Sequence, residues 1–137
     1  MTLTEFLTAR IAEDVELVRQ LTTGEHAEPS RWRDSRGDIM GETWVLGSRR
    51  IAILDEGNQV SSLAGEHIAR WDPSRVLAEC EAKRRIVDYR EQCERDRDEA
   101  AEARDLFAAR LLAFDATLRA LALPYADHPD YDETWRP

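Results

Sequence analysis

The first stretch of the chain repeats apolar residues at steps of three and four, with acidic residues between them. This spacing places the apolar side chains on one face of a helix and the acidic ones on the other. Thr2 and Glu5 stand in capping-box spacing at its start, and Gly24 supplies a C-terminal stop. The pattern therefore predicts an amphipathic helix over residues 1–23. Its apolar stripe consists of Leu3, Phe6, Leu7, Ile11, Val15, Val18 and Leu21.

Short runs of β-branched and aromatic residues occupy the next part of the chain. Two such runs flank Gly47 and Ser48, a pair typical of a tight hairpin turn. After a second turn signal, residues 60–63 are expected to add a third short strand. The sequence thus predicts an antiparallel β-meander over residues 43–63, followed by a short helical turn at residues 65–71. A sheet this small needs helices to cover its apolar face.

A long segment without glycine or internal proline follows. Asp72 and Pro73 mark its start, because Asp is a favoured N-cap and Pro fits the first helical position. After the charged run at residues 94–99, apolar residues recur at steps of three and four. One unbroken helix would span about 75 Å and would be expected to pair with a second copy. A compact chain favours instead a helical hairpin over residues 72–123, broken near the charged run.

The last fourteen residues are too aromatic for a solvated tail, because they contain Tyr125, Tyr131 and Trp135. We expect these rings to pack back onto the domain along an extended path. The predicted fold is therefore a single, mostly helical α+β domain. Its expected parts are a helix at 1–23, a β-meander at 43–63, a helical hairpin at 72–123 and a packed tail at 124–137.

Composition narrows the class of protein. The chain has 137 residues, a net charge of −9 and a hydrophobic fraction of 42%, which together are typical of one globular domain with charged outer surfaces. It contains no apolar run long enough to span a membrane. Its first turns carry acidic residues, which is unlike a signal peptide. We expect a cytoplasmic protein.

One segment departs from the acidic balance. Residues 31–54 carry five basic and three acidic side chains, whereas the rest of the chain is net acidic and repels nucleic acid. Direct nucleic-acid binding is therefore not expected. Within this segment Trp32, Arg33, Arg49 and Arg50 are candidates for binding a protein partner. The alternative is a solvated hairpin face on which arginine stems lie over tryptophan.

The best candidate for chemistry is a set of imidazoles and carboxylates. Two histidines and several acids can hold a metal or transfer protons if the tail folds against the start of the second long helix. The set consists of His67, Asp72, Asp127, His128 and Asp130. The alternative is structural: His67 lies beside an N-cap, and His128 precedes Pro129 in a turn. No local ligand pair or nucleophile motif is present, and we expect no bound metal or cofactor.

The two cysteines, Cys80 and Cys93, stand thirteen residues apart. On one helix this separation corresponds to about 20 Å, too far for a disulfide. We expect free thiols, with Cys80 facing the core and Cys93 near an exposed helix end.

Four phrases spread along most of the chain carry a resemblance. They are TEFLTARIAED at 4–14, HIARWDPSRVLA at 67–78, EAKRRIV at 81–87, and TLRALA at 117–122 running into YADHPDY at 125–131. The chain resembles an actinobacterial and actinophage family known only as a domain of unknown function. The resemblance implies relatives rather than an activity. Many members carry a Cys/His insertion between the two long helices and a Cys before the TLR phrase. Here the charged run at 94–99 and Asp115 or Ala116 take those places, so the metal site implied by those members is not carried over.

These observations favour a non-enzymatic protein-interaction module that self-associates through its helices or binds a protein partner. One alternative is a small metal-binding domain or metal-dependent enzyme centred on His67 and His128. Another is an acidic, nucleic-acid-linked regulator or a DNA mimic.

Overall fold

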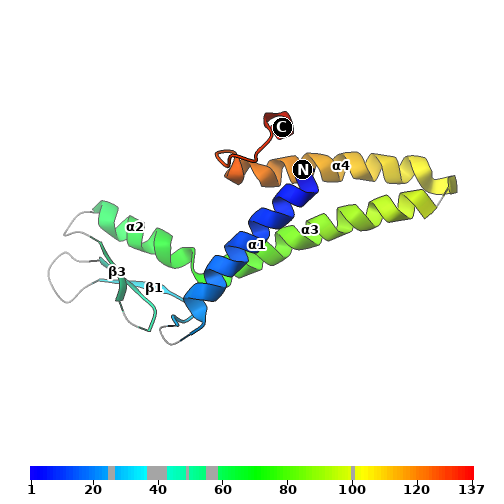
Figure 1. Ribbon diagram of the computed structural model, residues 1–137. Coiled ribbons are helices and arrows are strands. Elements are labelled where there is room, and N and C mark those ends of the chain that lie inside the picture. The colour runs from blue at the N-terminus through cyan, green and yellow to red at the C-terminus, as the bar shows by residue number, and fades with distance from the viewer. Residues whose placement is uncertain (25–26, 37–42, 49, 55–58, 100) are drawn as a thin grey trace. The chain divides into compact units, whose positions relative to one another are not determined.

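The computed structural model describes residues 1–24, 27–36, 43–48, 50–54, 59–99 and 101–137 (Figure 1). The chain divides into two compact units. The first joins Met1–Glu13 to Cys80–Pro137, and the second comprises Asp14–Glu79. The chain is mostly helical with one small antiparallel sheet, which confirms the predicted α+β class. Whether the two units act as the single domain predicted above stays a prediction.

The N-terminal helix α1 (Leu3–Thr22) begins with the capping box expected from the sequence. The backbone N–H of Glu5 donates to Thr2 Oγ1 at 3.2 Å, and that of Thr2 donates to Glu5 Oε2 at 2.7 Å. The hydrogen bond from the Thr2 backbone N–H lowers the pKa of the Glu5 carboxyl. After the helix, Gly24 adopts a positive φ of 98°, a conformation that glycine reaches without steric cost. Both predicted ends of the helix are confirmed.

The sheet has three antiparallel strands in the order β1-β2-β3: β1 (Arg33–Arg36), β2 (Thr43–Leu46) and β3 (Arg50–Leu54). The predicted hairpin is β2 and β3, whose ladder pairs Thr43 with Leu54 and carries an irregularity between Val45 and Leu46. The polar strand β1 was not predicted. It joins the edge of the sheet through backbone pairing with β2, which requires no alternation of apolar side chains.

The predicted third strand at residues 60–63 is wrong. These residues belong to helix α2 (Gln59–Arg70), which packs against the strands of the sheet. The short helical turn expected at residues 65–71 is part of the same helix, which ends at Arg70. Gly65 and Ala69, one helical turn apart, are both buried in α2. Packing of α2 against the strands overrides the strand pattern that residues 60–63 show in the sequence.

The predicted helical hairpin is confirmed. Helix α3 (Pro73–Glu99) starts at the expected cap, where the Arg75 N–H donates to Asp72 Oδ1 at 2.9 Å. It continues through the whole charged run, and the break follows at the 3₁₀ turn η1 (Ala101–Ala103). Helix α4 (Arg104–Ala122) then returns antiparallel to the Cys80–Glu99 part of α3 (Figure 1). Ion pairs at i,i+4 spacing, such as Arg90 with Glu94, keep the charged run helical.

The core of the first unit gathers around Phe6, whose side chain is fully buried. Buried side chains from three helices enclose it: Leu7 of α1, Val87 of α3, and Leu118 and Ala122 of α4. The predicted aromatic tail packs against this cluster. Its 3₁₀ turns η2 (Leu123–Tyr125) and η3 (Glu133–Trp135) bring Tyr125, Tyr131 and Trp135 to the ring of Phe6.

Both cysteines are buried, and neither takes part in a disulfide. Cys80 lies in the interior, as predicted. The expectation that Cys93 lies near an exposed helix end is wrong, because its exposure is only 6%. The helix does not fray at this point but continues to Glu99, and α4 returns against it, so that Cys93 Sγ lies 3.8 Å from the carbonyl oxygen of Phe107.

Candidate interaction surfaces

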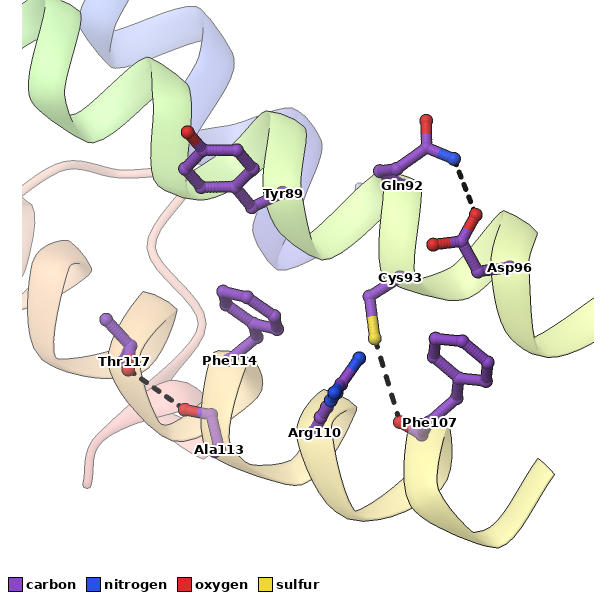
Figure 2. A pocket seen from close by; sticks show the side chains of 9 residues that line it. All are labelled: Tyr89, Gln92, Cys93, Asp96, Phe107, Arg110, Ala113, Phe114 and Thr117. Carbon is purple, nitrogen blue, oxygen red and sulfur yellow. Dashed lines mark hydrogen bonds between the residues drawn. The ribbon is translucent and has the colours of Figure 1, made fainter. Parts of the chain in front are cut away.

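An open groove of about 530 Å³ lies between α3 and α4 in the first unit (Figure 2). Its aromatic side chains are Tyr89, 61% exposed, and the half-buried Phe107 and Phe114. Figure 2 shows the rings of Phe107 and Phe114 and the thiol of Cys93 lying between the two helices. A volume of this size is typical of a site that receives a small ligand or a few side chains of a partner.

Helical spacing builds this groove from both sides. Tyr89, Gln92, Cys93 and Asp96 recur at steps of three and four on α3, and residues 107, 110, 114 and 117 do so on α4. Asp96 lies nine residues beyond the core residue Val87, or about two and a half turns, so it projects from the opposite side of α3. The groove therefore occupies a face of α3 that the core of the unit does not use.

The rim of the groove is polar and already hydrogen-bonded. Gln92 Nε2 donates to Asp96 Oδ1 at 2.7 Å, and Thr117 Oγ1 donates to the carbonyl of Ala113 at 2.9 Å. The guanidinium of Arg110 lies 5.5 Å from the ring centroid of Phe107. The groove therefore offers apolar contact between a negative charge, Asp96, and a positive charge, Arg110. Among its lining residues no acid–base pair or activated nucleophile lies beside the aromatic rings.

Ion pairs tie the two helices together beside the groove. Arg90 Nε donates to Asp115 Oδ1 at 3.0 Å, and the same guanidinium pairs with Glu94. Burial alone would lower the pKa of Arg90, but the hydrogen bond to Asp115 and the charges of both carboxylates raise it. Arg90 therefore stays charged and holds α3 and α4 in the geometry that forms the groove.

A smaller apolar cleft of about 290 Å³ lies in the second unit. It brings the predicted partner-binding residue Trp32 together with Trp71 and with leucines of α1, among them the exposed Leu17. The guanidinium of Arg75 covers the Trp71 ring at 4.2 Å from its centroid, a cation–π contact. The sequence singled out Trp32 but gave no signal that Trp71 would join it.

The other predicted partner-binding residues are only partly placed. Arg33 is exposed at the start of β1, immediately after Trp32. Arg50 begins β3, and Arg49 lies outside the described residues. Whether these side chains form one surface therefore stays a prediction.

Basic side chains also line a hollow of about 410 Å³ in the second unit, which includes Arg31, Arg70 and Arg75. Two of these charges are already paired within their own helices. Arg70 binds Glu66, and Arg75 Nε donates to Glu79 Oε1 at 3.0 Å. This pairing weakens the field that would attract the phosphates of a nucleic acid.

The residues proposed for metal chemistry have separate structural contacts. Asp72 is buried and accepts hydrogen bonds from two backbone N–H groups, those of Trp32 and Arg75. His67 is exposed on α2, in the second unit, whereas His128 belongs to the tail of the first. No group of three His, Cys, Asp or Glu side chains suited to a metal ion occurs among the residues that the structure describes.

His128 has a structural environment of its own. Its Nδ1 accepts from the Asp130 N–H at 3.1 Å, as expected for a turn, and its ring packs on Phe6. NH1 of Arg10 lies 2.8 Å from Nδ1 and also contacts Nε2. A cation at this ring must therefore compete with a guanidinium. Asp127 is exposed, and Asp130 Oδ2 lies 4.0 Å from His128 Nδ1.

Two buried charged residues that organise the units were not predicted from the sequence. Arg10 joins the tail to α1 and also pairs with Glu13 at 2.7 Å. Glu28 accepts from the N–H and the hydroxyl of Ser48, at 3.1 and 2.9 Å, and so holds the β2–β3 turn. Arg10 stands next to the apolar position Ile11 in the α1 stripe, which is the only signal that marks it in the sequence.

The resemblance noted in the sequence is resolved at the level of the family. A family model described as a family of unknown function, DUF6221, matches residues 1–137. The chain belongs to this family. No curated protein and no solved structure matches it. None of the described helices has the length and apolar character that crossing a membrane requires.

Proposed function

We propose that this DUF6221 chain is a non-enzymatic protein-interaction module that binds a helical segment of another protein in the α3–α4 groove. The observation that carries the proposal is the open groove itself, in which Tyr89, Phe107 and Phe114 stay accessible. Apolar side chains that are accessible and gathered in one groove are typical of an interaction site. We further propose that the module is cytoplasmic and, on the sequence resemblance, that it comes from an actinobacterium or an actinophage.

The chemistry of the rim defines the occupant. A groove between two helices accepts the apolar stripe of an amphipathic helix, whose side chains at i, i+3 and i+4 enter between the rings. Asp96 on α3 favours a basic residue on one flank of the incoming helix, and Arg110 on α4 favours an acidic one on the other. The occupant is therefore an amphipathic helix with flanks of opposite charge.

The Trp32 cleft supports a second contact for a protein partner. Trp32 and Trp71 supply apolar area there, and the neighbouring Arg33 supplies positive charge. Enriched tryptophan and arginine are typical of contacts that dominate binding energy. If this surface contributes, the double variant Arg33→Glu, Arg50→Glu weakens partner binding, whereas His67→Gln and His128→Gln leave it unchanged.

Site-specific photo-crosslinking in the native host tests the groove. A photoreactive residue placed at position 89 is expected to label a protein partner, and the same residue at Ala108, exposed on α4 away from the groove, serves as the matched control. A peptide covering the labelled segment should then bind the purified chain, with affinity lowered about tenfold by Tyr89→Asp. Equal labelling at both positions, or a labelled segment with no amphipathic pattern, contradicts the proposal.

The same preparations test the metal alternative. The interaction module is expected to bind its partner equally well before and after treatment with a chelator. Stoichiometric zinc or manganese that disappears in His67→Gln and His128→Gln, together with loss of an activity, would favour the metal-dependent enzyme instead.

A further inference from the structure

The outer side of α4 carries a second apolar surface, distinct from the groove. Its leucines are Leu106, 55% exposed, and Leu112, 73% exposed. All members of this surface are exposed: Leu106, Ala109, Leu112, Ala113, Ala116 and Ala120. We call it the α4 outer face, and it meets the groove at Ala113. Within α4, Asp105 and Arg119 flank this surface on the side of Leu112, and Arg110 flanks it on the side of the groove.

The α4 outer face has the periodicity of a coiled-coil seam. Residues 106, 109, 113, 116 and 120 follow one another at steps of three, four, three and four. The unit's own core uses the other side of the helix, through Leu111 and Leu118. Ala113 and Ala120 each follow a buried leucine by two residues, or about 200° around the helix. One helix therefore carries two apolar sides, and the described part of the chain buries one of them.

Two charges that flank this seam, Asp105 and Arg119, can pair with the same two residues of a second copy. Asp105 and Arg119 both lie seven residues from Leu112, one towards each end of α4. When two copies of α4 pack antiparallel about a two-fold axis at Leu112, each Asp105 faces Arg119 of the other copy. Both pairs lie about 10 Å from the axis along the helix, and the two Leu112 side chains meet at its centre.

We infer that a second copy of this chain covers the α4 outer face, with the two α4 helices antiparallel. The alanines allow the helix axes to approach to about 8 Å, and the leucines supply the apolar contact. The Asp105–Arg119 pairs select the orientation, because flanking charges in coiled coils determine partner and direction. In a parallel pair Asp105 instead faces Arg110 of the second copy, so charge exchange distinguishes the two arrangements.

This inference rests on the proposed function in naming one partner of the module, but the surface that it uses shares only Ala113 with the groove. The groove residues Tyr89, Gln92 and Asp96 lie on α3 and take no part in the seam. Labelling from position 89 with a monomeric chain would overturn the inference alone. A dimer that labels nothing from position 89 would overturn only the proposed function.

Sedimentation velocity and light scattering of the full chain at micromolar concentration test the second copy. The wild-type chain and Ala82→Asp, which adds a charge at an exposed position of α3, are expected to be dimers of twice 15.7 kDa. Leu112→Asp places two like charges at the axis and is expected to give a monomer with an unchanged circular dichroism spectrum. A monomeric wild-type chain, or a Leu112→Asp dimer as tight as wild type, overturns the inference.

A charge exchange tests the antiparallel orientation. Asp105→Arg is expected to weaken dimerisation about tenfold, and adding Arg119→Asp is expected to restore it. Arg119 NH1 also donates to the Thr134 carbonyl at 2.8 Å, but the double variant lacks that bond as well, so recovery reports the new pair alone. Recovery with Arg110→Asp in place of Arg119→Asp would show a parallel pair and overturn the proposed geometry.

Discussion

The two sides of helix α3 in the first unit use aromatic residues in opposite ways. On the core side, the Phe6 ring is fully buried and has four aromatic rings of the tail within 6.4 Å, that of His128 among them, the nearest being Trp135 at 5.0 Å. On the groove side, Tyr89, Phe107 and Phe114 surround an open volume of about 530 Å³. Composition does not distinguish the two sides. Whether a side of the helix is closed to solvent depends on whether another segment of the chain covers its aromatic residues with further rings.

That difference separates stabilising aromatics from aromatics available for binding. A ring surrounded by other rings contributes its whole apolar area to the free energy of unfolding. A ring beside an open groove contributes part of that area and leaves the rest for a partner. Substitutions on the core side should therefore change stability, and those on the groove side should change binding.

The largest effect is expected from removing the cover on the core side. Truncation after Leu123 deletes Tyr125, Tyr131 and Trp135 and leaves Phe6 facing solvent. The loss should reach at least the value for one buried aromatic, about 3–5 kcal/mol in the free energy of unfolding. Urea denaturation followed by circular dichroism measures it. An unchanged midpoint would mean that the tail does not stabilise the unit.

A matched pair of substitutions compares the two sides directly. Phe6→Ala is expected to cost about 3–5 kcal/mol, because it empties a closed cluster. Phe107→Ala removes a half-buried ring beside open space and is expected to cost roughly 1–2 kcal/mol. The two free energies come from denaturant unfolding under identical conditions. Equal costs would show that the groove is closed in solution.

The ion pair beside the groove should have a smaller effect. Asp115→Asn removes the charge that Arg90 Nε contacts, while Glu94 still pairs with the same guanidinium. We expect a loss of about 1 kcal/mol in unfolding free energy, as for partly exposed ion pairs. Thermal unfolding at low and high salt measures it. High salt should reduce the difference between the variant and the wild type, and a loss that does not depend on salt would contradict an electrostatic origin.

The smallest effect concerns an exposed pair outside both regions. The hydrogen bond from Arg19 Nε, at 2.7 Å, lowers the pKa of the Glu16 carboxyl to about 2. Because this pKa is depressed in the folded state, the stabilisation is present above pH 4.5 and is lost as the pH falls towards 2. Carboxyl NMR shifts of Glu16 report the titration. Arg19→Met should raise the midpoint towards the usual value, although Gln20 Nε2 still donates to Glu16 Oε1 at 2.9 Å. An unchanged midpoint would assign the shift to another group.

Periodicity and caps predicted the parts of this fold that local chemistry determines. Thr2, Gly24 and Asp72 fix helix ends through bonds to nearby backbone, so their sequence signals are reliable. The errors lie where long-range packing decides. The four polar residues of β1 become a strand only because β2 lies beside them, and residues 60–63 become helical through the packing of α2 on the sheet.

The candidate surfaces followed the same rule. The sequence marked Trp32 and Arg33, but it could not show that Trp71 lies with Trp32, because that contact depends on tertiary structure. The groove residues Phe107 and Phe114 appeared in the sequence only as part of an apolar stripe. Their accessibility depends on how α3 and α4 pack, and no single-helix pattern contains that information.

The discontinuity of the first unit also has a consequence for biosynthesis. This unit combines residues 1–13 with residues 80–137, and the contact between Phe6 and Trp135 joins positions 129 residues apart. During translation Phe6 emerges first, and its last neighbours emerge only when the chain is almost finished. Nascent or prematurely terminated chains therefore present this apolar cluster uncovered, in the state most prone to aggregation or to capture by chaperones.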